Sequence, residues 1–118
     1  MIDLHCHILP GIDDGAENLE EAVSICRLAA ADGCRAMVAT PHQRRGAWWN
    51  CDAAKLARLH RELQQGVGPE PRLHLGGEIH VDSSQLLDEL ERLPESGLQS
   101  LAGSRYLLLE FSAAFSAT

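Results

Sequence analysis

The sequence has few basic residues for its size. Its 10 Lys and Arg against 17 Asp and Glu give a formal net charge of -7 at pH 7, which argues against nucleic acid, a partner that requires clustered positive charge. No apolar segment is long enough to cross a bilayer, and the N-terminus lacks a signal-peptide pattern. The four cysteines form no C-x-x-C pair, so we interpret them as free thiols of a reducing compartment. We therefore expect a cytoplasmic protein without membrane insertion.

Apolar runs with strand character alternate with amphipathic segments. With 118 residues, of which 45% are hydrophobic, the chain forms one domain or part of one. Asn18 with Glu21 three residues later predicts a helix start, and Asp52 predicts another. The expected strands cover residues 2–7, 34–42, 72–82 and 104–111, and the expected helices cover residues 18–33, 51–66 and 83–93. This alternation predicts an α/β fold with parallel strands.

Side chains that can bind a metal stand near the end of every expected strand. They are His5, His7, His42, Glu78 and Glu110. Barrel enzymes build their sites at the carboxyl ends of the strands, whereas an open doubly wound sheet concentrates them at one switch point. No Gly-x-Gly-x-x-Gly loop follows the first strand, which further disfavours a nucleotide-binding sheet. We predict one half of a closed (β/α) barrel.

Each of these residues also has a purely structural interpretation. An H-x-H pair near a strand end is a weak motif, and Asp13-Asp14 before Gly15 is more typical of an Asx-turn than of a ligand pair. His42 could be exposed in a loop, and Glu78 could cap the following helix. Glu110 directly after "YLLL" is harder to explain in this way, because a buried carboxylate must be paired or coordinated. Their joint placement at successive strand ends favours a metal site.

Other polar residues are expected to be structural. We expect His60 on the solvated face of its helix, His74 as a satisfied core histidine, and Cys6 facing the helices, away from the histidines. His80 has strand spacing from Glu78 and could approach a site, but carries little weight.

The loop "QRRGAWWN" follows His42 and contains two tryptophans and two arginines. The tryptophans could line a substrate groove or merely cover the helix below. The arginines beside them could attract phosphate.

The candidate ligands offer nitrogen and oxygen rather than sulfur. This set suits Mn, Fe or Zn in a hydrolytic site better than a structural zinc. A carboxylate such as Glu78 can bridge two metals, and the nucleophile would then be a hydroxide, because a metal lowers the pKa of its bound water. No cysteine has an arginine at the Cys-(five residues)-Arg spacing of the cysteine phosphatases.

Four motifs, "MIDLHCHILPGIDDGAENLEEA", "ATPH", "GGEI" and "GSRYLLLEF", resemble the bacterial PHP-domain protein-tyrosine phosphatases of capsular and exopolysaccharide loci, the CpsB/YwqE type. The resemblance implies a distorted (β/α) barrel with a metal cluster, usually manganese. It implies that His5 and His7 bind the first metal, that Asp14 and His42 serve another, that Glu78 bridges, and that Glu110 completes the set. The implied substrate is phosphotyrosine on the bacterial tyrosine kinase that controls polysaccharide synthesis.

Members of this family are about twice as long, as a complete barrel requires. We therefore interpret residues 1–118 as a single partial PHP-type domain. The remaining half of the family's barrel would supply further ligands and the phosphate-binding arginines, so no catalytic residue is assigned in this chain. Relatives often have a second histidine at the position of Gln43, which we do not expect to matter for the main ligands.

A half-barrel leaves its first and last strands unpaired, which predicts a homo-oligomer, a partner polypeptide carrying the second half, or a fragment of a longer gene. Two alternatives to the tyrosine phosphatase remain. One is another PHP-type hydrolase of small phosphoesters, and the other is a binding remnant that keeps the ligands without turnover.

Overall fold

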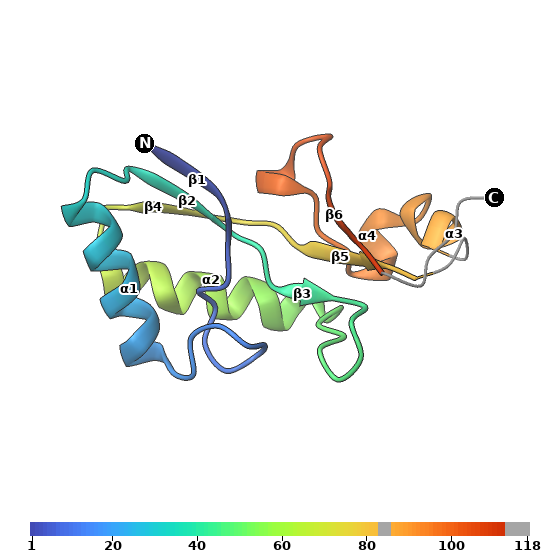
Figure 1. Cartoon of the computed structure of the whole chain (residues 1–118), viewed down its shortest axis with the longest axis horizontal. Coiled ribbons are helices and arrows are strands. Elements are labelled where there is room, and N and C mark those ends of the chain that lie inside the picture. The colour runs from blue at the N-terminus through green and yellow to red at the C-terminus, as the bar shows by residue number, and fades with distance from the viewer. Residues whose placement is uncertain (83–85, 113–118) are drawn as a thin grey trace.

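The computed structural model describes residues 1–82 and 86–112, in which strands and helices alternate as the sequence predicts (Figure 1). The elements are β1 (Ile2–Cys6), α1 (Leu19–Ala31), β2 (Ala36–Ala39), β3 (His42–Gln43), α2 (Ala53–Val67), β4 (Arg72–Leu75), β5 (Glu78–Val81), α3 (Leu86–Leu90), α4 (Leu93–Ser96), the 3-10 turn η1 (Leu101–Gly103) and β6 (Leu108–Phe111). The described strands all pair in parallel, which confirms the α/β class.

The two long helices begin where local sequence signals place them. Asn18 Oδ1 accepts a hydrogen bond from the Glu21 N–H at 2.8 Å, and Asp52 Oδ1 accepts one from the Lys55 N–H at 3.1 Å. Such caps satisfy N–H groups that have no partner within the helix. Both helices cover the same face of the sheet formed by β1, β2 and β4 (Figure 1). The core between them is centred on Cys26 of α1 and on Leu56, Leu59 and Leu63 of α2.

Cys26 lies fully buried in the apolar stripe of α1, as expected. Burial raises the pKa of its thiol to about 11, and the charge of Cys34 adds to the shift. At pH 8 on the order of one molecule in a thousand then carries the reactive thiolate. We expect iodoacetamide to leave Cys26 unmodified in the folded chain. It should modify Cys26 readily in about 8 M urea, which unfolds most domains and exposes the thiol. Equal labelling rates by peptide mass spectrometry in both conditions would contradict this packing.

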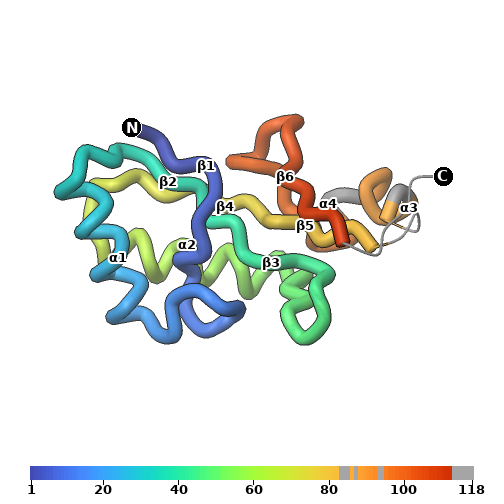
Figure 2. The backbone as a smooth tube through the Cα atoms, in the orientation of Figure 1, coloured from blue at the N-terminus to red at the C-terminus, as the bar shows by residue number. Residues whose placement is uncertain are grey.

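Two of the expected strands are broken in the middle. Residues 34–42 form β2 and β3, separated at Thr40 and Pro41, and residues 72–82 form β4 and β5, separated at Gly76 and Gly77. Proline has no N–H for a ladder, and glycine weakens a strand interior. Two three-stranded sheets result, with the orders β1-β2-β4 and β3-β5-β6. The tube in Figure 2 shows them following one another along the molecule, whose extents are 45 × 26 × 25 Å.

Backbone hydrogen bonds keep the segments 39–41 and 76–78 paired across this break. The Gly76 N–H donates to Ala39 O at 2.8 Å, and the Glu78 N–H donates to Pro41 O at 2.9 Å. The two middle strands therefore stay in register, and the residues that follow the break on each strand remain neighbours. This continuity positions the polar residues described below.

The expected helix over residues 83–93 is also interrupted. The described part contains α3 and α4, and residues 83–85 lie outside the described residues. Pro94 lies in the first turn of α4, which ends at Gly97 in the left-handed conformation with φ of 77°. Proline has no backbone N–H, so a helix that continued through Pro94 would lose a hydrogen bond at that residue. The chain instead starts a new helix there.

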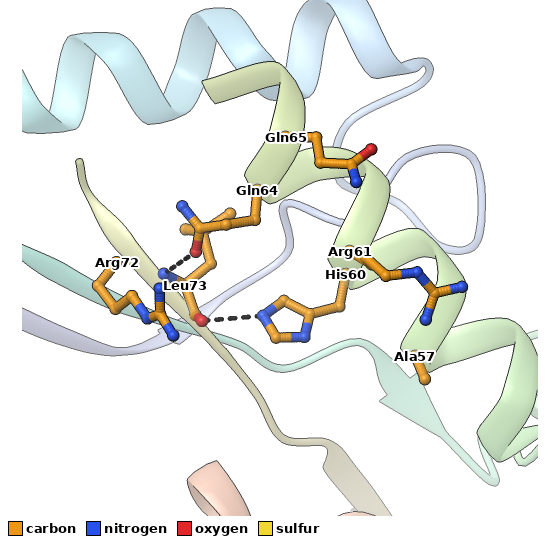
Figure 3. Close-up of a pocket in the computed structure, with 7 residues that line it drawn as sticks. All are labelled: Ala57, His60, Arg61, Gln64, Gln65, Arg72 and Leu73. Atoms are coloured by element: carbon orange, nitrogen blue, oxygen red, sulfur yellow. Dashed lines mark hydrogen bonds between the residues drawn. The ribbon is translucent and has the colours of Figure 1, made fainter. Parts of the chain in front are cut away.

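The outer edge of β4 is covered by side chains of α2 (Figure 3). Gln64 Oε1 accepts from the Leu73 N–H at 2.7 Å, and His60 Nε2 lies 2.8 Å from Leu73 O. The expectation that His60 is solvated was therefore wrong, because this ring reaches back to the strand beneath its helix. Since an unpaired edge is a template for other strands, these contacts protect this part of the sheet.

The outer edges of β1 and β6 carry exposed apolar side chains. Ile2 on β1 is 65% exposed and Phe111 on β6 is 61% exposed, and neither outer edge pairs with another described strand. A homo-oligomer or a second polypeptide at these edges stays a prediction. Across residues 1–82 and 86–112, no helix combines the length and apolarity needed to span a membrane.

Candidate metal centre

The break between the two sheets is where the predicted metal ligands meet. His42 begins β3 and Glu78 begins β5, and the two residues are paired in register. We expected Pro41 to end the second strand just before His42, and it does, whereas the third strand also ends early, before Gly76 and Gly77, and resumes at Glu78. His5 on β1 and Glu110 on β6 approach from the neighbouring strands. The parallel arrangement therefore collects side chains from all four chain segments at one place.

Glu78 is the centre of the cluster. Its side chain is only 5% exposed, and Oε1 lies 2.5 Å from His5 Nε2 and 3.5 Å from His7 Nε2. The other oxygen, Oε2, lies 3.3 Å from His42 Nδ1. One buried carboxylate thus faces three imidazoles from two different strands and a loop.

The potential ligand atoms form three overlapping triplets. All the atoms of each triplet lie within 4.8 Å of one another, and the triplets are His5, His7 and Glu78; His7, Asp14 and His42; and His42, Glu78 and Glu110. Every residue that the sequence nominated as a ligand belongs to at least one triplet. A neutral imidazole has a single lone pair for a metal, so His7 and His42 can each complete only one triplet at a time.

Two buried donor atoms in the cluster fit a bound cation. His42 Nδ1 and Glu78 Oε2 make no hydrogen bond with any described residue, although buried polar atoms are normally paired. A metal ion would satisfy both atoms. Their nitrogen and oxygen chemistry suits Mn, Fe or Zn.

Asp13 orients two members of the cluster, a role that the sequence did not reveal. Its Oδ2 lies 3.0 Å from His7 Nδ1 and accepts the His42 N–H at 3.1 Å, while its Oδ1 accepts the Gly15 N–H at 3.0 Å. The last bond is the Asx-turn expected from the sequence. Because Nδ1 of His7 is bound to Asp13, the ring directs Nε2 toward Glu78, as carboxylates commonly do for metal-binding histidines.

Asp14 reaches the cluster from the same turn. Its Oδ1 lies 3.3 Å from His42 Nε2, and its side chain is exposed. The turn also depends on Gly15, where a Cβ would lie 2.0 Å from the backbone oxygen of His7. A glycine at this position therefore lets the turn close directly onto the histidine.

Glu110 is paired with His80, a histidine to which the sequence gave little weight. His80 Nδ1 lies 3.0 Å from Glu110 Oε1, and the two residues are in register on β5 and β6. Burial acts to raise the pKa of Glu110, but the hydrogen bond from His80 and the charge of Arg45 outweigh it, so the pKa is lowered. The carboxylate form that a metal needs is thereby favoured.

Cys6 and Gln43 lie beside the cluster but are engaged elsewhere. Burial raises the pKa of the Cys6 thiol to about 12, with the charge of Asp3 adding to it, and Cys6 packs against the core below the sheet. The fully buried amide of Gln43 donates to Asn50 O and Gly97 O, both at 2.9 Å. Among described residues, neither belongs to a metal-ligand triplet.

A parallel α/β sheet with a histidine and carboxylate cluster where its strands meet is the architecture of barrel-type proteins with metal sites. A family model described as capsular polysaccharide synthesis, CpsB/CapC, matches residues 1–118. The chain belongs to the CpsB/CapC family.

Two curated relatives are similar in sequence to nearly the whole of this chain. The chain is 35% identical over 114 residues to the tyrosine-protein phosphatase YwqE of Bacillus subtilis, which covers 94% of this chain and 43% of the relative. It is 34% identical over 115 residues to the tyrosine-protein phosphatase CpsB of Streptococcus pneumoniae, which covers 95% of this chain and 45% of the relative. The chain therefore spans about half the length of the curated relatives it matches.

A solved structure confirms the fold. It belongs to a study of YwqE from Bacillus subtilis and CpsB from Streptococcus pneumoniae as unique metal-dependent tyrosine phosphatases. The similarity has a TM-score of 0.79 at 34% identity and covers 95% of this chain and 44% of that one. The fold of this chain thus corresponds to part of the YwqE/CpsB fold, as the motifs predicted.

Proposed function

We propose that this chain supplies metal-binding residues of a metal-dependent protein-tyrosine phosphatase. The observation that carries the proposal is the convergence of three histidines on the buried carboxylate of Glu78. The family relationship supports the reaction, since YwqE and CpsB are named tyrosine-protein phosphatases. The proposed substrate is phosphotyrosine on a bacterial tyrosine kinase of a polysaccharide locus.

The ligands divide without conflict if only Glu78 is shared. His5 and His7 with one oxygen of Glu78 would hold one ion, Asp14 and His42 with the other oxygen would serve a second, and Glu110 would complete the set. This division uses each imidazole once and uses both oxygens of the central carboxylate. Asp13 holds His7 and the His42 backbone in place, and His80 holds Glu110.

Bound divalent cations would polarise the phosphoryl group and lower the pKa of water, which is the chemistry that phosphomonoester hydrolysis needs. We propose manganese as the natural metal, with iron and zinc as the other candidates that this donor set suits. The four free cysteines suit a reducing compartment, which supports a cytoplasmic location.

We expect the purified chain to hydrolyse a phosphotyrosine peptide when Mn²⁺ is added and to lose that turnover in EDTA. His42→Ala should lower kcat/KM at least about 100-fold, since it removes one metal ligand. His74→Ala is the matched control, because His74 lies on β4 outside every triplet, and it should change the rate less than about twofold. Released phosphate is the measurement.

Three results would count against the proposal. Mn²⁺-dependent turnover that survives in His42→Ala would show that the cluster is not the reactive centre. Faster turnover of a small phosphoester than of the peptide would instead favour the small-molecule hydrolase. A chain that binds metal but never turns over would be the binding remnant.

A further inference from the structure

The segment after His42 forms a tight hairpin beside the metal centre. The Arg44 N–H donates to Trp49 O at 3.0 Å, and Arg45 and Trp48 exchange backbone hydrogen bonds of 3.2 and 2.8 Å. Asn50 closes the hairpin by donating to both His42 O and Ile12 O at 2.9 Å. Asn50 and the hairpin hydrogen bonds therefore hold the backbone of Arg45 and Trp48 in a fixed position relative to His42.

Trp48 ends a column of stacked rings. The His7 and His42 rings lie 4.4 Å apart at 21°, and the His42 and Trp48 rings lie 5.4 Å apart at 18°. Trp48 remains partly exposed. The His42 ring covers one face of the indole, and the partly exposed remainder offers an apolar surface at the edge of the reactive centre, on which aromatic rings can pack favourably.

Arg45 lies over the ring of this indole, and some of its N–H groups remain free to donate. Its guanidinium carbon lies 5.8 Å from the Trp48 ring centre, and Nη1 lies 3.4 Å from both His42 Nε2 and Glu110 Oε2. Both contacts use Nη1, so the other guanidinium N–H groups are without a partner among described residues. The side chain is 42% exposed. Arginine with free N–H groups is well suited to bind phosphoryl oxygens in pairs.

The neighbouring arginine differs in its burial and in how many of its N–H groups are engaged. Arg44 is buried, lies 3.0 Å from Glu89 Oε2 through Nε, and donates to His80 O. The charge of Arg44 is therefore paired with Glu89 inside the fold. Of the two arginines in the loop, only Arg45 is therefore available to a ligand at the metal centre.

We propose that Trp48 and Arg45 form a receptor for aryl phosphates, in which the substrate ring stacks on Trp48 and Arg45 donates to the phosphoryl oxygens. These are specificity-determining residues, and they make the site prefer an aromatic phosphomonoester to an alkyl one. The inference rests on the proposed function and assigns two residues of this chain to the recognition of its substrate. It adds an arginine in this chain to those that the family resemblance places elsewhere.

The test compares the binding of phenylphosphonate and methylphosphonate by isothermal titration calorimetry, with Mn²⁺ and with EDTA. Neither probe can be hydrolysed, so the test is independent of turnover. The chain should bind the phenyl compound about tenfold more tightly. Trp48→Leu should remove most of this preference, and Arg45→Gln should weaken both probes about tenfold while leaving the preference in place.

Two matched controls occur in the chain. Trp49 is 50% exposed and lies under Arg44, so Trp49→Leu should keep the phenyl preference. Arg105 lies over Tyr106 at 5.3 Å, so Arg105→Gln should change binding less than twofold. The inference is overturned if each variant matches its control, or if phenylphosphonate does not bind in either condition. Phosphatase failure with phenyl preference intact would instead reject the proposed function alone.

Discussion

Replacing Glu78 with glutamine should remove most of the metal affinity of this chain. Glu78 is the residue on which His5, His7 and His42 converge, and it belongs to two of the three ligand triplets. Glutamine has nearly the same shape but no charge, and only its carbonyl oxygen can bind a cation. We expect the affinity for Mn²⁺ to fall at least 100-fold, to judge from the 10- to 100-fold losses caused by more distant partners of metal ligands.

Thermal unfolding measures this effect without reference to activity. A ligand that binds only the folded chain at about 100 times its dissociation constant stabilises it by about 2.7 kcal/mol. For a domain of this size, that corresponds to a rise in Tm of about 10 °C. The parent chain should show this rise on addition of Mn²⁺, and Glu78→Gln should show almost none.

Glu62→Gln is the matched control for this experiment. Glu62 is a half-exposed carboxylate on α2 that pairs with Arg58 at 3.4 Å and lies in no ligand triplet. Its Mn²⁺-induced rise in Tm should equal that of the parent chain. If Glu78→Gln kept the full rise as well, the cluster around Glu78 would not be the metal site.

Leu63→Ala should destabilise the chain by about 3 kcal/mol, within the 2–5 kcal/mol typical of a buried leucine. Leu63 on α2 is fully buried in the core between the two long helices and the sheet. Truncation removes apolar contacts and leaves a cavity that packed neighbours cannot fill. Since a domain is stable by only about 5–15 kcal/mol, this loss should be plain as a lower urea midpoint.

The matched control is Leu28→Ala, because Leu28 also lies on a helix but is 72% exposed. Both substitutions change helix propensity equally, so their difference isolates burial. We expect Leu28→Ala to change the free energy of unfolding by less than about 0.5 kcal/mol. Equal losses in the two variants would show that α2 does not pack on the sheet as described.

Several features of this protein were readable from short stretches of sequence. The caps at Asn18 and Asp52 and the buried leucines of α2 follow from spacings of a few residues, and the parallel pairing follows from the alternation of strands and helices. The candidate metal ligands His5, His7, His42, Glu78 and Glu110 were likewise chosen because they stand near the ends of apolar strand segments, whereas Asp14 came from the family resemblance. These signals are local because helix caps and side-chain alternation depend only on near neighbours.

The errors also came from local signals that compete. Gly76 and Gly77 interrupt the expected strand over residues 72–82, whose apolar pattern continues through them, and the pattern alone does not decide which effect prevails. In the structure the strand breaks there, and the expected helix over residues 83–93 likewise ends early, at Leu90. The consequence is functional, since the break between the sheets is the position at which His42 and Glu78 face each other.

Only the tertiary structure decided which candidate ligands contact the same carboxylate. Glu78 contacts His5 across 73 residues of sequence, and that contact depends on strand register rather than on spacing along the chain. The same is true of Asp13 beneath His7, His80 against Glu110, and Arg45 beside Trp48. The sequence by itself determined the residue types and the elements that carry them. Pairing between distant strands determined that those residues form one centre, because side-chain distances of 3 Å arise only once the backbone is placed.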